Sequence, residues 1–283
     1  MTRSTEVKDE LRRRIGDALC RLRGQGTVSD KVVHDARKDL KRARATLRLL
    51  RPAVGEDIYA RENAALRDAA RPLSGVRDAK VVMDALDDLL KRDKNAAQRA
   101  LLLKLRAPLE KARLAARKEM QRTDTLDKSA KALEDAWMRV QRWRISGKGA
   151  SDLREGLKRI YVRGRKALAN AETERSPECL HELRKQVKYL GQALEVVDPA
   201  EGGRFSKLIE RSASVADALG DDHDLVVLQE QIKTVHGSPN AHAALTAQIA
   251  KRRKKLQLKA LKKGRMLYKA KAGRLVKRVR NVP

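Results

Sequence analysis

The chain has 283 residues, with 66 Lys and Arg against 37 Asp and Glu and a formal net charge of +29. A hydrophobic fraction of 41% argues against a disordered chain, and so much positive charge indicates a protein that binds a polyanion or is stabilised by one. Aromatic residues make up only 2% of the chain, which argues against a surface that stacks nucleic-acid bases.

The first half of the chain predicts a succession of helices. Ala, Leu, Arg, Lys and Glu dominate it, and alternating β-branched runs are missing. Gly24 and Gly26 are expected to end the first helix, Ser29 or Asp30 to cap the second, and Pro52 to end it. The predicted helices cover about residues 5–23, 30–50, 56–71, 78–92, 95–122 and 126–144.

The second half repeats this order after a predicted linker at 146–151. The segment LGDDHD at 219–224 is predicted to be a turn, as the counterpart of LSGVRD at 73–78. Long helices joined by short turns favour antiparallel bundles. We therefore predict an all-α protein, a single domain over 5–283. It would be made of two antiparallel helical bundles, 5–145 and 151–281, related by an internal pseudo-two-fold repeat. The predicted helices of this half cover about 152–170, 177–198, 201–219, 224–235, 240–269 and 271–280.

Two of these helices, 147 residues apart, carry the same pattern: residues 34–52 read HDARKDLKRARATLRLLRP and residues 181–199 read HELRKQVKYLGQALEVVDP. In each copy, five apolar positions with spacings of 4, 3, 4 and 3 form one stripe that can pack into a core. The opposite face of the first copy is a row of cations headed by a histidine, about 21 Å long at helical rise.

These cationic rows supply the candidate binding residues. Regularly spaced Arg and Lys fit phosphate oxygens, Arg through a planar fork and Lys through a compact charge. In the second copy Tyr189 and Gly191 take the places of two of the Arg residues, so that helix should make fewer contacts. The candidates on the two helices are His34, Arg37, Lys38, Lys41, Arg42, Arg44, Arg48, His181, Arg184, Lys185 and Lys188, and Arg14, Arg159, Arg163 and Arg165 are expected to add to them from the adjacent helices.

Each of these assignments has a plainer alternative. A charge row can be a solvated helix face, and His34 and His181 either contact phosphate or support the packing of the two helices. The basic run 251–255 is expected to face solvent. The acidic cluster at 221–224 has no metal-binding counterpart at 75–78, so its shared aspartate is expected to cap a helix or to pair with an Arg.

The doubled pattern H-x-x-R-x-x-x-K, present as His34, Arg37 and Lys41 and again on the second helix, resembles the conserved histidine α-helical domain, CHAD. The segments 219–224 and 73–78 resemble the L-G-x-x-[RHN]-D form of that family. The resemblance covers about residues 5–280. It implies an all-helical fold of two four-helix-type bundles, with inorganic polyphosphate bound in a basic central cleft.

The sequence thus predicts a non-catalytic polyphosphate-binding protein with no cofactor, no metal site and no catalytic residue. Two other functions stay open: binding to nucleic-acid backbones, and an enzyme that acts on a phosphorylated substrate. No G-x-x-x-x-G-K-[ST] loop that would cradle a nucleotide occurs in the sequence.

The predicted location is the cytoplasm, with polyphosphate granules as a further candidate and the membrane excluded as a partner. No apolar run approaches the ~18 residues of a membrane span, and the N-terminus lacks the apolar segment of a secretory signal. Cys20 and Cys179 fall in helical patterns and are expected to be reduced core or boundary residues.

Overall fold

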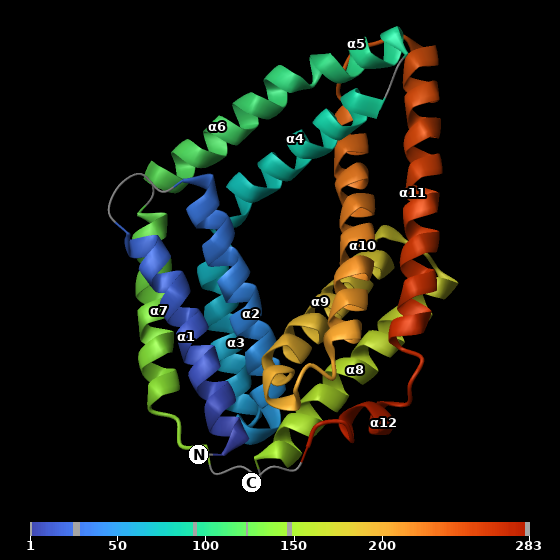
Figure 1. The fold of residues 1–283 in the computed structure, drawn as a ribbon. Coiled ribbons are helices and arrows are strands. Elements are labelled where there is room, and N and C mark those ends of the chain that lie inside the picture. Colours follow the sequence, from blue (N-terminus) through green and yellow to red (C-terminus); the bar gives the residue numbers. More distant parts are fainter. Residues whose placement is uncertain (1, 25–28, 93–94, 123, 146–148, 281–283) are drawn as a thin grey trace.

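The computed structural model describes residues 2–24, 29–92, 95–122, 124–145 and 149–280. Within these ranges every regular element is a helix (Figure 1), which confirms the predicted all-α class. The helices of the first half are α1 (Arg3–Arg23), α2 (Asp30–Val54), α3 (Glu56–Ala70), α4 (Ser74–Arg92), α5 (Ala96–Lys104), α6 (Arg106–Arg122) and α7 (Thr125–Gln141). Those of the second half are α8 (Ala150–Thr173), α9 (Pro177–Val197), η1 (Pro199–Glu201), α10 (Ser206–Ile232), α11 (Pro239–Leu267) and α12 (Ala272–Val276).

The two repeated helices begin in the same way. The Ser29 hydroxyl accepts a hydrogen bond from the Val32 amide at 3.3 Å, and the Ser176 hydroxyl accepts one from the Cys179 amide at 3.2 Å. Both serines satisfy an amide that has no partner within the first helical turn. Gly24 directly follows α1 as predicted, whereas Gly26 and residues 146–148 of the predicted linker lie outside the described residues.

Two predicted boundaries next to prolines are wrong. The helix predicted over 95–122 is divided at Leu105, because Pro108 has no N–H for the Lys104 carbonyl and its ring would clash with that group. By contrast α2 continues through Pro52 to Val54. Pro52 lies in the last turn of α2, where it removes a single hydrogen bond, and the helix ends at Gly55, whose φ is 84°.

The predicted turns at 219–224 and 73–78 are also different in the structure. The single helix α10 runs through 219–224, and α4 begins at Ser74. Gly220 is buried inside α10, where an arginine of α9 lies directly against it. The small residue leaves room for that guanidinium, so the glycine here is a packing position and not a chain break.

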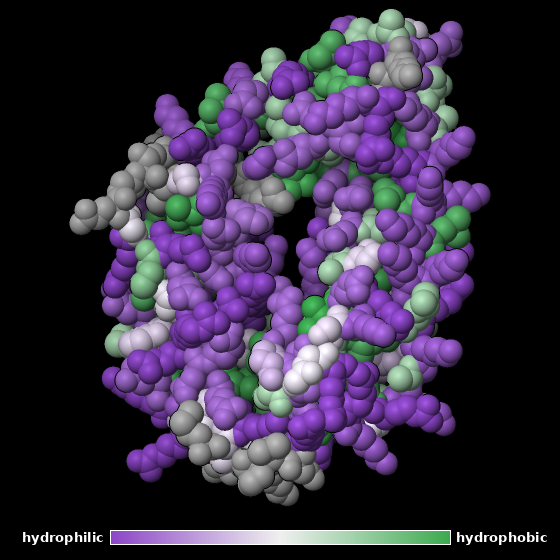
Figure 2. Space-filling model, viewed as in Figure 1, coloured by the Kyte–Doolittle hydropathy of each residue, from purple (hydrophilic) through white to green (hydrophobic). Residues whose placement is uncertain are grey.

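The larger core joins both halves of the chain. The apolar stripes of α2 and α9 are fully buried in it, together with residues of α1, α7, α8 and α10. A second core lies where α4, α5 and α6 meet α10 and α11, and it includes Leu86, Leu102, Leu228 and Leu245. Figure 1 shows the consequence: the helices close a ring, and Figure 2 shows an opening in the middle of this face of the molecule.

The chain ends meet at one buried carboxylate. Glu201 of η1 forms an ion pair with Arg3 at the start of α1 and accepts a hydrogen bond from the Arg280 amide at 3.1 Å. Of the two cysteines, Cys179 is partly buried, but Cys20 is exposed, so its prediction as a core or boundary residue is wrong. Both thiols are free, as predicted.

The helices of the two halves come into backbone contact at Gly156. A Cβ placed on Gly156 of α8 would lie 2.0 Å from the Leu49 carbonyl oxygen of α2, so the two backbones touch at this point. We expect Gly156→Ala to lower the free energy of unfolding by about 1–3 kcal/mol or more, because neither backbone can move without disturbing the core. Denaturant titration followed by circular dichroism measures this loss.

The matched control is Gly273→Ala on α12. Nothing lies within 4 Å of a Cβ at Gly273, so this variant should be neutral or more stable by less than about 1 kcal/mol. If the two substitutions change the free energy of unfolding equally, the close contact between α8 and α2 does not contribute to stability.

Candidate functional site

A cavity of about 960 Å³ lies between α2, α4, α6, α9 and α10. The first turns of α2 and of α9 line it with seven of the predicted binding residues, and α10 adds a third histidine, His223. The predicted residues that line the cavity are His34, Arg37, Lys38, Lys41, His181, Arg184 and Lys188. The structure thus brings together the N-terminal halves of both cationic rows.

The apolar stripes explain why these two faces meet. Leu40 and Leu47 of α2 and Leu183 and Leu190 of α9 are all fully buried in the shared core. The same core also holds α2 against α9, and the first turns of both cationic rows line one cavity beside it. The hydrophobic pattern therefore positions the charges.

The arginines of both rows lie against the start or the middle of another helix. On α9, the Arg184 guanidinium contacts Gly220 of α10, where a Cβ would be 3.1 Å from Nη2. On α2, Arg37 donates a hydrogen bond to the Ser74 hydroxyl at the start of α4. Ser74 and Gly220 follow a leucine in the two repeated segments, so the same pairing of motifs occurs twice.

His223 was missed by the sequence analysis because its segment was predicted to be a turn. In the helix α10, His223 faces α9, and its ring lies 5.0 Å from the ring of His181 between centroids. Partial burial lowers the pKa of His181, and His223, Arg184 and Lys185 lower it further, against a smaller opposite effect of Glu182. His181 is therefore mostly neutral at pH 7 in the free protein.

Carboxylates also line the cavity. Asp217 and Asp224 project from α10 and Glu195 from α9. Asp224 lies inside α10, so its prediction as a helix cap is wrong, and the side chain of its counterpart Asp78 lies outside the described residues. The cavity therefore contains both charges, with cations from α2 and α9 and carboxylates from α9 and α10.

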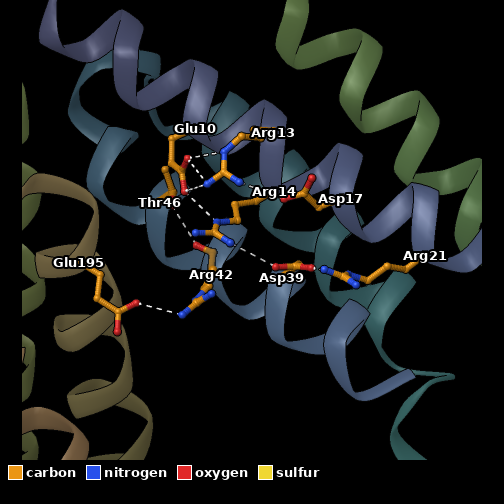
Figure 3. A network of polar contacts seen from close by, with 9 residues as sticks. All are labelled: Glu10, Arg13, Arg14, Asp17, Arg21, Asp39, Arg42, Thr46 and Glu195. Carbon is orange, nitrogen blue, oxygen red and sulfur yellow. Dashed lines mark hydrogen bonds and ion pairs between the residues drawn. The ribbon is translucent and has the colours of Figure 1, made fainter. Parts of the chain in front are cut away.

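Arg14 and Arg42 do not line this cavity. Figure 3 shows them in a network on the side of α1 and α2, where Arg14 pairs with Glu10 at 2.8 Å and with Asp39 at 3.4 Å. Arg42 lies 3.5 Å from Glu195 of α9. Nearby carboxylates thus compensate both arginines, and their prediction as cleft residues is not met.

Arg44 and Arg48 are used for packing. The Arg44 Nε donates to the Asn63 side chain at 3.2 Å, and burial lowers the pKa of Arg44. The Arg48 guanidinium stacks on the ring of Tyr189 at 3.8 Å and donates to the Arg44 carbonyl. The last turns of the α2 row therefore join α2 to α3 and α9, away from the cavity.

The other predicted cations lie on outer surfaces. Lys185 is exposed and pairs with Glu182, and on α8 Arg159 pairs with Glu155 at 3.1 Å. Arg163 and Arg165 are exposed on α8 as well. None of these four residues lines the cavity.

The run at 251–255 only partly faces solvent. Lys251, Lys254 and Lys255 are exposed, as expected. Arg252 forms an ion pair with Asp88 of α4, and Arg253 pairs with the buried Asp222 of α10 at 3.1 Å. These two arginines join α11 to α4 and α10. The sequence of the basic run does not show which of its residues form such ion pairs.

The family model of the CHAD domain matches residues 13–233. The chain belongs to the CHAD domain family. A search of curated proteins found no match. Among the described residues, there is no helix long and apolar enough to cross a membrane, and no group of three or more His, Cys, Asp or Glu residues that could hold a metal ion.

Two solved structures share the fold of this CHAD chain at low sequence identity. PptA from Streptomyces chartreusis superposes with a TM-score of 0.70 at 16% identity, covering 95% of this chain and 100% of that one. The crystal structure of the CHAD domain from the plant Ricinus communis gives a TM-score of 0.59 at 16% identity, covering 100% of this chain and 93% of that one.

The histidine pair generates a prediction for the free CHAD protein. We expect His181 to titrate below the ordinary pKa of about 6.5, as followed by NMR chemical shifts between pH 4.5 and 8. Replacing His223 by Gln removes a like charge and should raise the pKa of His181 part of the way back, because burial, the largest cause, stays. A His181 pKa at or above 6.5 would contradict this description of the site.

Proposed function

We propose that this CHAD chain binds inorganic polyphosphate in the cavity between α2, α9 and α10. The observation that carries the proposal is the convergence of two matched rows, headed by His34 and His181, on one cavity. Arg37 and Arg184 supply forked donors for phosphate oxygens, and the lysines supply compact charges. A linear polyphosphate carries a negative charge at each unit, which matches cations repeated at each helical turn.

The size of the cavity favours a narrow polyanion. The cavity has a volume of about 960 Å³ and lies among five helices. A polyphosphate chain is a single narrow strand without bases, so it can enter a space between helices. A DNA duplex, whose major groove alone is roughly 12 Å wide, is much broader.

The balance of charges in the cavity favours an anion. Five Lys and Arg residues line the cavity against three Asp and Glu residues, so the space is positive overall. A polyanion would be attracted to the cations of α2 and α9, and the carboxylates would limit how many phosphates bind there. Three histidines also line the cavity.

We also propose that the protein binds the chain without cleaving or extending it, in the cytoplasm and at polyphosphate granules. The cavity offers donors for phosphate oxygens along both helices, which suits recognition of an extended chain. Incubation with long-chain polyphosphate should leave its length unchanged on gels. Release of phosphate that requires Arg184 and Lys188 would contradict the non-catalytic proposal.

Charge reversal inside the cavity should weaken polyphosphate binding. We expect the double variants Arg37→Glu with Lys41→Glu, and Arg184→Glu with Lys188→Glu, to lose at least tenfold in affinity by titration calorimetry. In the unaltered protein the logarithm of affinity should fall linearly with the logarithm of salt, by about 0.7 for each phosphate neutralised if the chain behaves as a single strand.

The matched control is Lys254→Glu with Lys255→Glu, which changes the net charge equally on an exposed face. Equal losses for the inner and outer variants would mean that polyphosphate follows net charge and not the cavity. Displacement of bound polyphosphate by duplex DNA at equal phosphate concentration would also contradict the proposal.

Polyphosphate binding should strengthen as the pH falls from about 8 to 6. In the free protein His181 is mostly neutral, because burial and its cationic neighbours His223, Arg184 and Lys185 lower its pKa against the opposing Glu182. A polyanion beside the pair favours the imidazolium, so binding raises that pKa and takes up protons. Affinity therefore rises as the pH falls towards the pKa of the bound state.

Calorimetry in buffers of different ionisation enthalpy measures this proton uptake. We expect it to be lost when His181 and His223 are both replaced by Gln, and to be changed less by His34→Gln. Uptake that is unchanged in the double variant would assign the histidines a purely structural role.

A further inference from the structure

The positive charge of the chain is concentrated at its C-terminal end. After Glu230 the sequence contains no Asp or Glu, but it contains sixteen Lys and Arg, more than half of the formal net charge of +29. Most of these residues belong to α11, to α12 and to the segment between them. The cavity described above uses none of them.

Six cations of α11 lie on one exposed face, which we call the α11 face. At 100° per residue they span an arc of about 140°, and from Lys251 to Arg265 they extend over about 21 Å. The opposite side of α11 is buried on the second core and on α8. The exposed members of the face are Lys251, Lys254, Lys255, Lys259, Lys262 and Arg265, with Leu258 and Met266 beside them, and the exposed Lys269 just after the end of α11 is counted with the face.

These cations are poorly compensated compared with those elsewhere on the surface. On the α1 side, Arg13 and Arg23 each pair with a carboxylate of their own or a neighbouring helix. Within the described part of the chain, Arg265 with Glu172 is the single ion pair formed by the α11 face. Repulsion along such a row is relieved when a polyanion binds, because its charges replace the missing carboxylates.

The shape of the face indicates which polyanion fits. An α-helix is about 10–12 Å across with its side chains, and the B-DNA major groove is about 12 Å wide. Cations over an arc of about 140° can reach the phosphate rows on both sides of the groove, whereas a single narrow chain would meet only part of them. The face is convex and open, so the size limit of the cavity does not apply.

Two other occupants fit less well. The face carries no aromatic residue on which unpaired bases could stack, which argues against single strands. A membrane-surface helix buries its apolar side in lipid, but the apolar side of α11 is already buried in protein. We propose that the α11 face binds the backbone of duplex nucleic acid, with no sequence preference, as a second polyanion site independent of the cavity.

The experiment removes four positive charges from each site in turn and measures the binding of two ligands. One variant carries Lys251→Gln, Lys255→Gln, Lys262→Gln and Lys269→Gln, and the other carries Gln at Arg37, Lys41, Arg184 and Lys188. Each is titrated with a fluorescent DNA duplex and with a short linear polyphosphate, by anisotropy and calorimetry. Circular dichroism confirms that both variants keep their helical fold.

We expect the α11 variant to lose at least tenfold in duplex affinity at physiological salt. The slope of log affinity against log salt should become shallower by about 3–4, which is close to 0.9 for each of the four phosphate contacts removed. Its affinity for short polyphosphate should stay within twofold. The cavity variant should show the reverse pattern.

Equal losses of duplex affinity in both variants would overturn the proposal, because they would reflect net charge alone. It would also be overturned if the α11 variant loses polyphosphate and not duplex affinity, or if anionic vesicles and not duplex DNA depend on the face. Failure of the polyphosphate proposal has a different signature, namely short-polyphosphate affinity that is unchanged in the cavity variant.

Discussion

The structure depends on the burial of two apolar stripes that force two cationic helices together. The rows on α2 and α9 place five Lys and Arg residues around one cavity, against three Asp and Glu residues. Leu40, Leu47, Leu183 and Leu190 are completely buried at the base of these helices, and each such side chain contributes roughly 1.5–3 kcal/mol relative to exposure. Hydrophobic packing thus maintains a charge arrangement that electrostatics alone would open.

Close backbone contacts then fix where the rows point. Gly156 lets α8 touch the backbone of α2 at Leu49, and Gly220 lets α10 receive the guanidinium of Arg184. The second contact is informative because the Arg184 Nε is buried and has no hydrogen-bond partner within the described structure. A buried guanidinium nitrogen without an acceptor is costly, and a phosphate oxygen entering the cavity could supply one.

Much of this could be predicted from the sequence, because the relevant signals are local and periodic. The stripe spacing predicted α2 and α9, and the doubled His, Arg and Lys pattern predicted which residues of their first turns come together. The approximate ends of α1, α3 and α9 followed from the same pattern, with glycine or proline nearby. These signals need no knowledge of distant partners.

The failures share a physical cause, which is that the decisive partner is far away in the sequence. Helical spacing placed Arg44 on the same face as Arg37, but Asn63 of α3 bonds Arg44 and takes it away from the cavity. In the same way, Arg14 looked available until Asp39 of α2 was found beside it. A cationic row on one helix therefore defines a face, and the neighbouring helices decide which part of it stays open.

Gly220 illustrates the same problem for chain breaks. Glycine followed by several aspartates is typical of a turn, and that prediction hid His223 from the candidate site. In the structure the absence of a Cβ serves the contact with Arg184 while the helix continues. At the equivalent place in the first half, Arg37 bonds to Ser74. The arginine of each cationic row therefore contacts this segment whether the position holds glycine or serine.

The distribution of acidic residues separates the two basic surfaces of the molecule. In the cavity, Asp217, Asp224 and Glu195 lie among the cations of α2 and α9, so the space contains both charges. On the α11 face the sequence provides no carboxylate after Glu230, and the surface is convex. The cavity is bounded by several helices and contains mixed charges, whereas the α11 face is an open row of cations along one helix. Under the two proposals, the chain distinguishes two polyanions by the shape of its surfaces and without contacting any base, because both surfaces are positive but their shapes differ.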